Sequence, residues 1–307
     1  MQVLRGLGDR PPRVCSTAAA IGNFDGLHLG HQKILRFLVA QAKVEGLVPL
    51  VLTFSPHPEK VLGRSSIAMI QTIVQRLEGI GVQGVKTTVI VPFNRAFSLL
   101  SKEDFAHDVI VSALRSKLVV VGENFRFGRR REGDVGNLRQ LGREFGFVVK
   151  AVPSVIRGGQ VVSSSLIRAL LQAGQVEEAA ELLGRPYEVE GRIIRGSARG
   201  KSLGIPTANI ETLNEITPAG VFLTEFQLGR QAFPSLTNVG RRPTFGCDTL
   251  HIESYLFGFQ GSAYGRKIKL RFLRKLRPER KYESPEALVA QIKVDMTAAG
   301  SYFKGRI

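Results

Sequence analysis

The sequence predicts a parallel α/β domain, followed by a small antiparallel β-barrel with a terminal helix. Two observations carry this prediction. Up to about residue 183, short apolar runs alternate with stretches of helical periodicity, which is typical of a parallel sheet covered by helices. From Gly184 onward, glycines and prolines interrupt short β-rich runs, and helical periodicity returns only over 285–298. We therefore expect two domains, 1–183 and 184–307.

The first domain is predicted to alternate strands with helices in a regular order. The strands are expected where short apolar runs lie between polar or glycine residues, at Val14–Ile21, Leu47–Thr53, Lys86–Val91, Leu118–Gly122 and Phe147–Val152. The helices are expected between them, at 31–44, 70–79, 102–115 and 134–144. Ser101 and Asp104 form a weak capping box before the third helix.

Length and composition allow two packed cores and set the class of protein. The chain has 307 residues, of which 43% are hydrophobic. It contains no uncharged apolar run of about 18 residues, and its N-terminus lacks a basic region followed by an apolar core. We therefore expect a cytoplasmic protein. Cys15 and Cys247 have no Cys or His at metal-ligand spacing, so neither a disulfide framework nor a zinc site is predicted.

The net charge of +17 predicts attraction to polyanions, which include RNA but also ATP and phosphorylated substrates. The densest basic clusters are Arg129–Arg131 and the stretch 266–281. In the second cluster, apolar residues alternate with basic ones, which favours a strand with one solvated face over a nucleic-acid groove. A polyanion-binding protein remains the alternative from another functional class. RNA binding that survives physiological salt and depends on 266–281 would support it.

The most informative segment is GNFDGLHLGH, residues 22–31, between the first predicted strand and the first predicted helix. Gly22 and Gly26 would let the backbone approach a ligand closely. A helix beginning near Gly30 would direct its free N–H groups at an anion. His28 and His31 lie one helical turn apart and could donate hydrogen bonds to phosphate oxygens as charge develops. The alternative is a glycine-rich turn with two solvated histidines.

Three further segments contain polar groups at sites where an α/β sheet binds ligands. TFSPHP (53–58) follows the second predicted strand, and VGENFRFG (121–128) follows the fourth. In the latter, Asn124 can donate and accept hydrogen bonds and Arg126 can pair with phosphate. SSSLIR (163–168) begins a helical run, so its hydroxyls could form an N-cap cluster or bind phosphate.

Taken together, these segments resemble the prokaryotic bifunctional riboflavin kinase/FMN adenylyltransferases, also called FAD synthetases. Residues 22–31 are similar to the HxGH signature of nucleotidyltransferases, and 163–168 to an SSTxIR motif in which Ser165 replaces threonine. The resemblance implies a Rossmann-like first domain with catalytic roles for His28, His31, Asn124 and Arg168. It implies ATP binding by Gly22, Phe24, Asp25, Gly26, Ser163, Ser164 and Ser165. It implies flavin binding by Phe54, Pro56, His57, Pro58, Phe125, Arg126 and Phe127.

The second domain carries a glycine-rich loop followed by PTAN, residues 206–209. Backbone amides of such a loop can cradle phosphates, and the loop supplies Gly196, Gly200, Lys201 and Gly204 as candidate ATP-binding residues. By resemblance to riboflavin kinases, Thr207 and Asn209 would hold the Mg²⁺ that bridges ATP phosphates. Glu253 matches the family's catalytic glutamate, which implies a general base for the terminal ribityl hydroxyl of riboflavin.

The resemblance implies an enzyme that makes FMN from riboflavin and ATP, and then FAD and pyrophosphate from FMN and a second ATP. Mg²⁺ is the expected cofactor of both steps. The expected partners are small molecules, with no nucleic acid and no membrane, and the sequence leaves the oligomeric state open. Gly258 stands where the family often has aspartate. This departure leaves one alternative, an FMN adenylyltransferase with a degenerate kinase domain that would have to be supplied with FMN.

Overall fold

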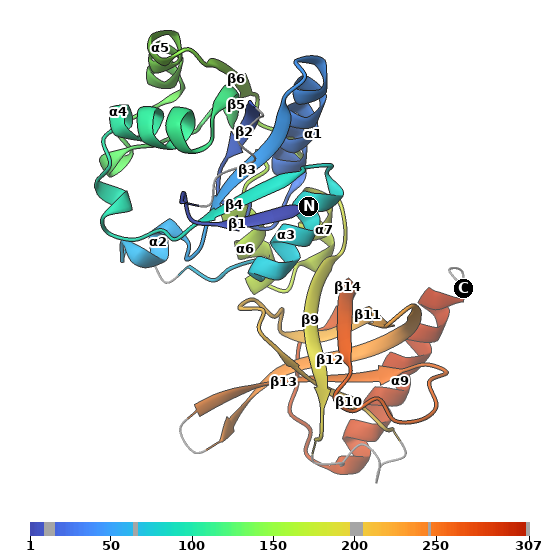
Figure 1. The fold of residues 1–307 in the computed structure, drawn as a ribbon. Coiled ribbons are helices and arrows are strands. Elements are labelled where there is room, and N and C mark those ends of the chain that lie inside the picture. Colours follow the sequence, from blue (N-terminus) through green and yellow to red (C-terminus); the bar gives the residue numbers. More distant parts are fainter. Residues whose placement is uncertain (9–15, 64–66, 197–204, 245–246, 305–307) are drawn as a thin grey trace. The chain divides into compact units, whose positions relative to one another are not determined.

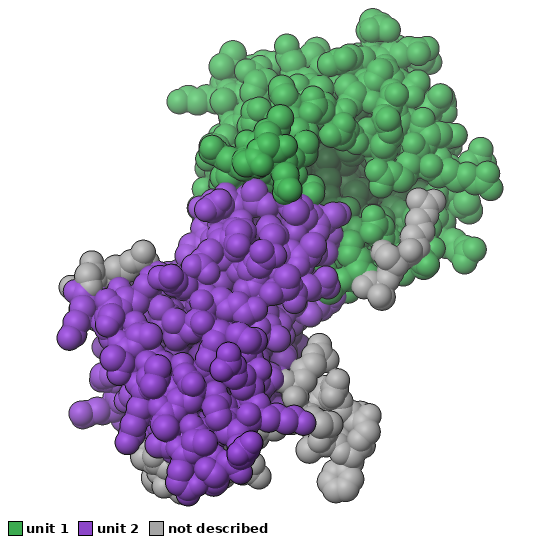
Figure 2. Space-filling view, turned by 180° about the vertical axis from the view of Figure 1, so that it is seen from behind, with its two compact units in different colours: residues 1–164 green, residues 165–307 purple. Residues whose placement is uncertain are grey.

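The computed structural model describes residues 1–8, 16–63, 67–196, 205–244 and 247–304, without the side chains of 241–249. The chain forms two compact units, 1–164 and 165–307, and each is described here by itself (Figures 1 and 2).

The first unit is built on a six-stranded parallel sheet in the order β1-β4-β3-β2-β5-β6 (Figure 1). From edge to edge the strands are β1 (Gln2–Arg5), β4 (Thr87–Val91), β3 (Val48–Phe54), β2 (Thr17–Ile21), β5 (Ser116–Gly122) and β6 (Val148–Val152). The predicted strands are all found, with small shifts at their ends; residues 14 and 15 lie outside the described part. β1 was not predicted because only one of its four side chains is buried.

Helices cover both faces of this sheet. The main ones are α1 (Leu29–Val44), α3 (Ile73–Val82) and α5 (Val135–Phe145), at or near their predicted positions. Alternate residues of β2 face opposite cores: Ala18 and Ala20 pack with α1, whereas Ala19 and Ile21 pack with the helical segment 105–113. The shorter elements are α2 (Pro58–Val61), η1 (Phe97–Leu99), η3 (Arg129–Arg131), β7 (Ile156–Arg157) and β8 (Gln160–Val161).

The order of the strands determines where a ligand can bind. From β2 the chain moves outward through β3 to β4, and it then crosses to β5 and β6 on the other side. Neighbouring strands β2 and β5 are thus followed by loops that leave in opposite directions, which opens a crevice at their carboxyl ends. The Rossmann-like first domain is confirmed, and residues 22–31 lie at this switch point.

A π-helix adjoins that crevice. α4 (Lys102–Asp104) continues as the π-helical segment η2 (Phe105–Ala113), at whose end the Leu114 N–H donates to the Val109 carbonyl at 2.9 Å. The sequence predicted a helix here but not its winding, since the apolar spacing suits an α-helix equally well. The predicted Ser101 cap is confirmed, because the Ser101 hydroxyl accepts from the Asp104 N–H at 3.0 Å. π-helices are rare and are often found beside functional sites.

The second unit is a closed barrel of six antiparallel strands, flanked by helices. Around the barrel the strands are β10 (Ala208–Thr212), β13 (Cys247–Leu256), β12 (Gln231–Thr244), β11 (Gly220–Leu228), β14 (Lys267–Arg277) and β9 (Tyr187–Ile194). The helices are α6 (Ser164–Gln172), α7 (Val176–Leu183) and α9 (Pro285–Phe303). Val221 and Leu223 of β11 pack with Ala299 and Phe303 of α9. The predicted barrel and its terminal helix are confirmed.

The opposite face of β11 contributes to a buried chain of hydroxyl groups. Thr224 lies within 2.7 Å of the Ser235 hydroxyl and 2.6 Å of the Thr237 hydroxyl, and Thr237 lies 2.7 Å from the Ser254 hydroxyl. All four residues are fully buried. Because an unpaired buried hydroxyl is costly, these contacts compensate for the loss of water.

The basic strand β14 is neutralised by acidic neighbours. Ile268, Leu270 and Phe272 are buried, as the predicted alternation requires. Of the residues between them, Lys269 lies 2.8 Å from Glu190, and Arg271 pairs with carboxylates of β9 and β11. Burial, the largest single effect, lowers the pKa of Arg271, but the hydrogen bonds and charges of Glu188 and Glu225 together raise this pKa above its usual value. This ion-paired face favours the solvated strand over a polyanion groove.

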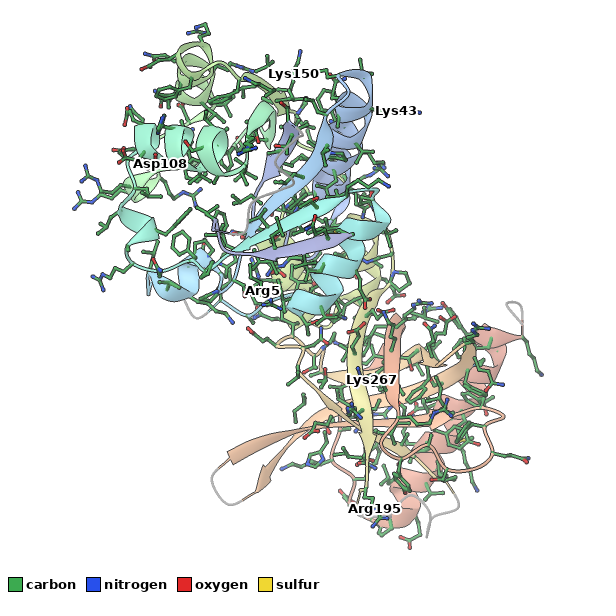
Figure 3. All side chains as sticks on the ribbon, in the orientation of Figure 1. Arg5, Lys43, Asp108, Lys150, Arg195 and Lys267 are labelled. Atoms are coloured by element: carbon green, nitrogen blue, oxygen red, sulfur yellow. The ribbon has the colours of Figure 1, made fainter. Side chains whose placement is uncertain are left out.

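Charged side chains also project from other parts of the two units, among them Lys43, Asp108 and Lys267 (Figure 3). No helix in the described ranges is long and apolar enough to cross a membrane.

Candidate functional site

The loop between β2 and α1 presents a pair of stacked histidines. His28 is the N-cap of α1, and its Nδ1 accepts from the His31 N–H at 3.3 Å. The two rings stack with centroids 3.7 Å apart and an angle of 19°. Because Nδ1 accepts, a neutral His28 carries its proton on Nε2 and can donate there. Phe24 packs edge-on against His31 at 5.2 Å, which restricts the second ring.

This loop holds an unusual backbone conformation. Phe24 and Leu27 have φ values of 51° and 44°, which are rare for residues other than glycine. Both side chains are almost completely buried, so hydrophobic burial offsets the strain. Gly26 has a φ of 82°, and a Cβ there would lie only 2.9 Å from Ile70. Glycine at 26 therefore allows both the turn and the close packing against Ile70, and an approach of this backbone to a ligand stays a prediction.

Asp25 holds the loop from within the protein. Its carboxylate is buried and accepts from the backbone N–H groups of Ile70 and Gln71 at 3.1 and 3.2 Å. The Ser164 hydroxyl donates to the Asp25 carbonyl at 2.9 Å. These two predicted ATP-binding residues thus have a clear supporting function, and a direct contact between either of them and ATP stays a prediction.

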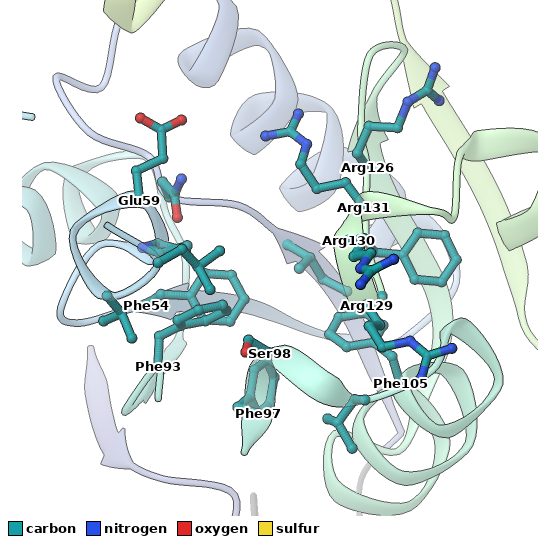
Figure 4. A pocket seen from close by; sticks show the side chains of 18 of the residues that line it. Phe54, Glu59, Phe93, Phe97, Ser98, Phe105, Arg126, Arg129, Arg130 and Arg131 are labelled. Atoms are coloured by element: carbon teal, nitrogen blue, oxygen red, sulfur yellow. The ribbon is translucent and has the colours of Figure 1, made fainter. Parts of the chain in front are cut away.

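A cavity of about 840 Å³ opens at the carboxyl ends of β2, β3 and β5. One wall is a continuous series of phenylalanine rings with neighbouring centroids 5.5–6.2 Å apart: Phe54, Phe93, Phe97, Phe105, Phe127 and Phe125. Five arginines also line it: Arg95, Arg126, Arg129, Arg130 and Arg131. Figure 4 shows Phe54, Phe93 and Phe97 on one side and the arginines of residues 126–131 on the other.

Most of the predicted flavin-binding residues meet in this cavity. Its lining includes Phe54, His57, Pro58, Phe125, Arg126 and Phe127, together with Gly22 and Asn124. Pro56 follows a cis peptide bond and is not part of the lining. His57 is nearly buried; its Nδ1 accepts from the Glu59 N–H at 3.2 Å, and its Nε2 lies 2.9 Å from the Asn23 amide.

The arginine wall follows a strained turn. Arg130 and Arg131 have φ values of 54° and 63°, so two successive arginines have a left-handed backbone conformation. Arg126 lies 3.5 Å from Asp134. A backbone hydrogen bond to Asn137 is the main cause that lowers the pKa of Asp134, with a smaller contribution from Arg126. A cavity lined by both aromatic rings and cations suits a flat ring system that carries an anionic group.

Sequence reasoning missed several residues of this cavity. Phe93 and Phe97 follow β4, and the rule that ligands bind after parallel strands could have pointed to them. The sequence shows Arg129–Arg131 as a basic cluster, but the sequence analysis does not assign this cluster to the site. Asn23 lies within the GNFDG segment, and nothing in the sequence indicates its contact with His57.

In the second unit, strand register brings the predicted kinase residues together. Asn209 of β10 pairs directly with Glu253 of β13, which in turn pairs with Asn238 of β12. Thr207 stands just before β10. A Cβ at Gly196 would collide with the Asn209 amide, so glycine lets the backbone and this amide approach without displacing the side chain. The other candidates of the glycine-rich loop, Gly200, Lys201 and Gly204, lie outside the described residues.

The donor set at this position fits a hard cation. The Thr207 hydroxyl and the Asn209 amide oxygen are ligands of the kind that Mg²⁺ prefers, and the Glu253 carboxylate stands opposite Asn209 in register. Over the ranges that the structure describes, no three His, Cys, Asp or Glu side chains form a group that could hold a metal ion.

The remaining predicted residues stand on or beside α6. Ser163 precedes the helix, whereas Ser165 and Arg168 belong to the second unit. Arg168 is 8% exposed. A direct role of these three residues in binding ATP phosphates stays a prediction.

Gly258 occupies an exposed turn after β13 with a φ of 74°, and a Cβ there would meet nothing within 4 Å. Glycine, asparagine and aspartate all tolerate this conformation. The replacement of aspartate by glycine therefore leaves the turn intact, and nothing around Gly258 indicates a degenerate kinase.

Comparisons with known proteins find matches along both parts of the chain. A family model for FAD synthetase matches residues 11–166, and one for riboflavin kinase matches residues 183–303. A bifunctional riboflavin kinase/FMN adenylyltransferase of Pseudomonas fluorescens is 35% identical over 97% of both chains. The proteins of the same name from Escherichia coli K12 and Bacillus subtilis are 33% and 34% identical, over 99% and 92% of this chain and 98% and 92% of theirs.

A solved structure described as a macrolide-efflux protein from Streptococcus pneumoniae has a TM-score of 0.89 and 27% identity, and the match covers 97% of this chain and 99% of that one. Two family models in sequence, relatives above 30% identity over nearly the whole length and the two sites described above lead to one conclusion: this chain belongs to the family of bifunctional riboflavin kinase/FMN adenylyltransferases.

Proposed function

We propose that this enzyme phosphorylates riboflavin to FMN in its barrel, and that it adenylylates FMN to FAD at the crevice of its parallel sheet. The cavity at β2, β3 and β5 carries this proposal, because it combines a wall of phenylalanine rings with arginines beside the His28–His31 loop. The domain bounds we propose are 1–183 for the adenylyltransferase and 184–307 for the kinase. We place the reactions in the cytoplasm, where ATP is available.

Adenylyl transfer needs no protein nucleophile. An oxygen of the FMN phosphate attacks the α-phosphorus of ATP, the bond to the bridging oxygen breaks, and pyrophosphate leaves. His28 and His31 donate hydrogen bonds to the oxygens on which negative charge builds up. The stacked rings and the N-cap bond of His28 hold these donors in place before the substrates arrive. Asn124 orients the FMN phosphate, and Arg168 neutralises phosphate charge.

Phosphorylation of riboflavin needs a general base. Glu253 takes the proton of the terminal ribityl hydroxyl while that oxygen attacks the γ-phosphorus of ATP, and ADP leaves with the bridging oxygen. Thr207 and Asn209 would hold Mg²⁺, which when bound would neutralise phosphate charge, and Glu253 stands opposite Asn209 on the neighbouring strand.

The test is a time course with purified enzyme, riboflavin, ATP and Mg²⁺, in which flavins are separated by chromatography. FMN that appears first and is followed by FAD would support both activities. A parallel reaction starts from FMN in place of riboflavin. Conversion of FMN without any use of riboflavin would indicate the degenerate-kinase alternative, and no product from either substrate would reject the proposal. Replacing Mg²⁺ by a chelator should stop both steps.

A further inference from the structure

Arg76 is a charged residue that is buried in the core, where a charge lowers the stability of the fold. It lies on α3, one face of which packs in the core with Ile80, and it is 3% exposed. Burial lowers the pKa of Arg76, and the nearby Asp25 carboxylate opposes this effect. Within the part of the chain that the structure describes, its Nε also lacks a hydrogen-bond partner. A buried guanidinium that is incompletely paired costs stability, so its presence calls for another explanation.

The contacts of Arg76 connect two loops of the adenylyltransferase site. Its Nη1 donates to the Asn23 carbonyl at 2.7 Å, and its Nη2 donates to the Phe54 carbonyl at 3.2 Å. Asn23 belongs to the loop after β2 that carries the histidines, and Phe54 ends β3 before the loop that carries His57. The rigid fork of a guanidinium thus spans the ends of two neighbouring strands.

Both of these carbonyls belong to residues that line the cavity, and Asn23 also contacts His57. A displacement of one loop relative to the other would therefore change the distance between a nucleotide held at His28 and His31 and a flavin held at Phe54. A misplacement of about 1 Å between reacting groups can cost about 10²-fold in rate.

We infer that Arg76 is a positioning residue for adenylyl transfer: it fixes the nucleotide loop against the flavin loop and so sets the alignment of the two substrates. This inference rests on the proposed function. Its signature is a loss of turnover without a loss of binding, because each loop still binds its own substrate when the fork between them is absent.

The test compares Arg76→Met, which retains length but not the fork, with Arg76→Lys, which can reach one carbonyl. Thr53→Val is the matched control, because the Thr53 hydroxyl donates to the same Asn23 carbonyl at 3.0 Å but does not reach Phe54. For each protein, we would measure kcat for FMN adenylylation, the Kd and stoichiometry of FMN and of ATP separately by calorimetry, and riboflavin phosphorylation as an internal control for folding.

We expect kcat for FMN adenylylation to fall about 10²-fold in Arg76→Met and about tenfold in Arg76→Lys. The Kd values should stay within about threefold, and riboflavin phosphorylation and Thr53→Val should be nearly unchanged. Should Arg76→Met not fold, the Arg76→Lys result decides. A normal kcat in Arg76→Lys, or a loss of FMN and ATP binding that parallels the loss of kcat, would overturn the inference. A wild-type enzyme that cannot convert FMN would reject the proposed function and this inference with it.

Discussion

The two units build their sites in different ways. In the first, the functional groups stand on loops after parallel strands, and these loops adopt left-handed conformations at Phe24, Leu27 and Gly26. In the second, Asn209 and Glu253 stand directly opposite each other on paired strands, where the hydrogen-bond ladder sets their spacing. We call the first a loop site and the second a register site. The loop site needs support from other parts of the fold, which Asp25 and Arg76 provide. The register site is positioned by the hydrogen-bonded strands themselves.

This difference predicts which substitutions should reduce the activity of each unit. In the first unit, substitutions of buried supports away from the substrates should reduce activity. In the second, activity should depend on the groups that contact substrate and on the integrity of the barrel. Because both reactions occur in one chain, each activity is a built-in control for the other.

The largest expected effect is in the register site. Glu253→Gln keeps the shape of the side chain but removes the base, so the rate of riboflavin phosphorylation should fall about 10²–10⁴-fold. FMN adenylylation should be unaffected. The measurement is the initial rate of each reaction, started from riboflavin or from FMN. If the folded variant lost both activities, the separation of the two sites would be wrong.

His31→Ala makes the reciprocal change in the loop site. It removes a donor to the developing charge, and FAD formation should fall at least 10²–10³-fold, while FMN still forms from riboflavin. Accumulation of FMN in a time course from riboflavin checks this directly. Continued FAD synthesis at the normal rate would remove His31 from the catalytic set.

The barrel site should be sensitive to its attached helix. Arg277 on β14 is half-buried and pairs with the buried Asp295 on α9, with Nη2 and Oδ2 2.7 Å apart. Burial, the largest single effect, lowers the pKa of Arg277, but the hydrogen bonds and charge of Asp295, together with Tyr282, raise this pKa above its usual value. Asp295→Ala removes the carboxylate partner of the half-buried Arg277 and should reduce the free energy of unfolding of the barrel by about 2 kcal/mol.

Denaturant unfolding followed by kinase activity measures this effect, and Asp295→Asn, which retains hydrogen-bond acceptance, should lose less stability. Adenylyltransferase activity that disappeared at the same denaturant concentration in every variant would show that the two units do not unfold independently.

A smaller effect is expected from the arginine wall. Replacing both Arg129 and Arg130 with alanine removes two exposed charges, and the KM for FMN should rise up to about tenfold, more at low salt than at high salt. The KM of the kinase for riboflavin, which is uncharged, should not change. The matched control is the double alanine variant of Arg139 and Arg143 on α5, outside the cavity. An equal rise of the KM for FMN in this control would mean that net charge, not the wall, attracts FMN.

The smallest effect is expected for Gly258→Asp. The turn accommodates aspartate and offers its Cβ no neighbour within 4 Å, so kinase kcat and KM should stay within about twofold. A large gain in kinase activity would contradict this prediction and would indicate that Gly258 lowers the kinase activity of this chain.

Much of the fold could be predicted because its signals are local. The apolar strands, the helical spacing of α1 and the change of texture after Gly184 all lie within short segments. The edge strand β1 was not predictable, because a strand with a single buried residue shows no alternation of apolar and polar residues. The π-helical conformation of 105–113 could not be predicted, because the spacing of apolar residues does not distinguish a π-helix from an α-helix.

The candidate site was predictable where its residues form contiguous motifs, and much less so where it depends on distant contacts. His28, His57 and Phe125 came from such motifs. Arg76 is one of many arginines in the chain, nothing in the predicted helix 70–79 distinguishes it, and only the packing of α3 shows that it is buried. Likewise, the pairing of Asn209 with Glu253 depends on a register that the sequence does not encode locally.

The hydroxyl chain inside the barrel has a consequence for how this domain can change over time. Each of Thr224, Ser235, Thr237 and Ser254 has a single hydrogen to give, so the direction of one bond restricts the direction of the next. Replacement of one member by an apolar residue would deprive a neighbour of its partner, whereas joint replacement of all four would not. These positions should therefore evolve as a linked group, and combined variants should be more stable than the sum of the single ones indicates.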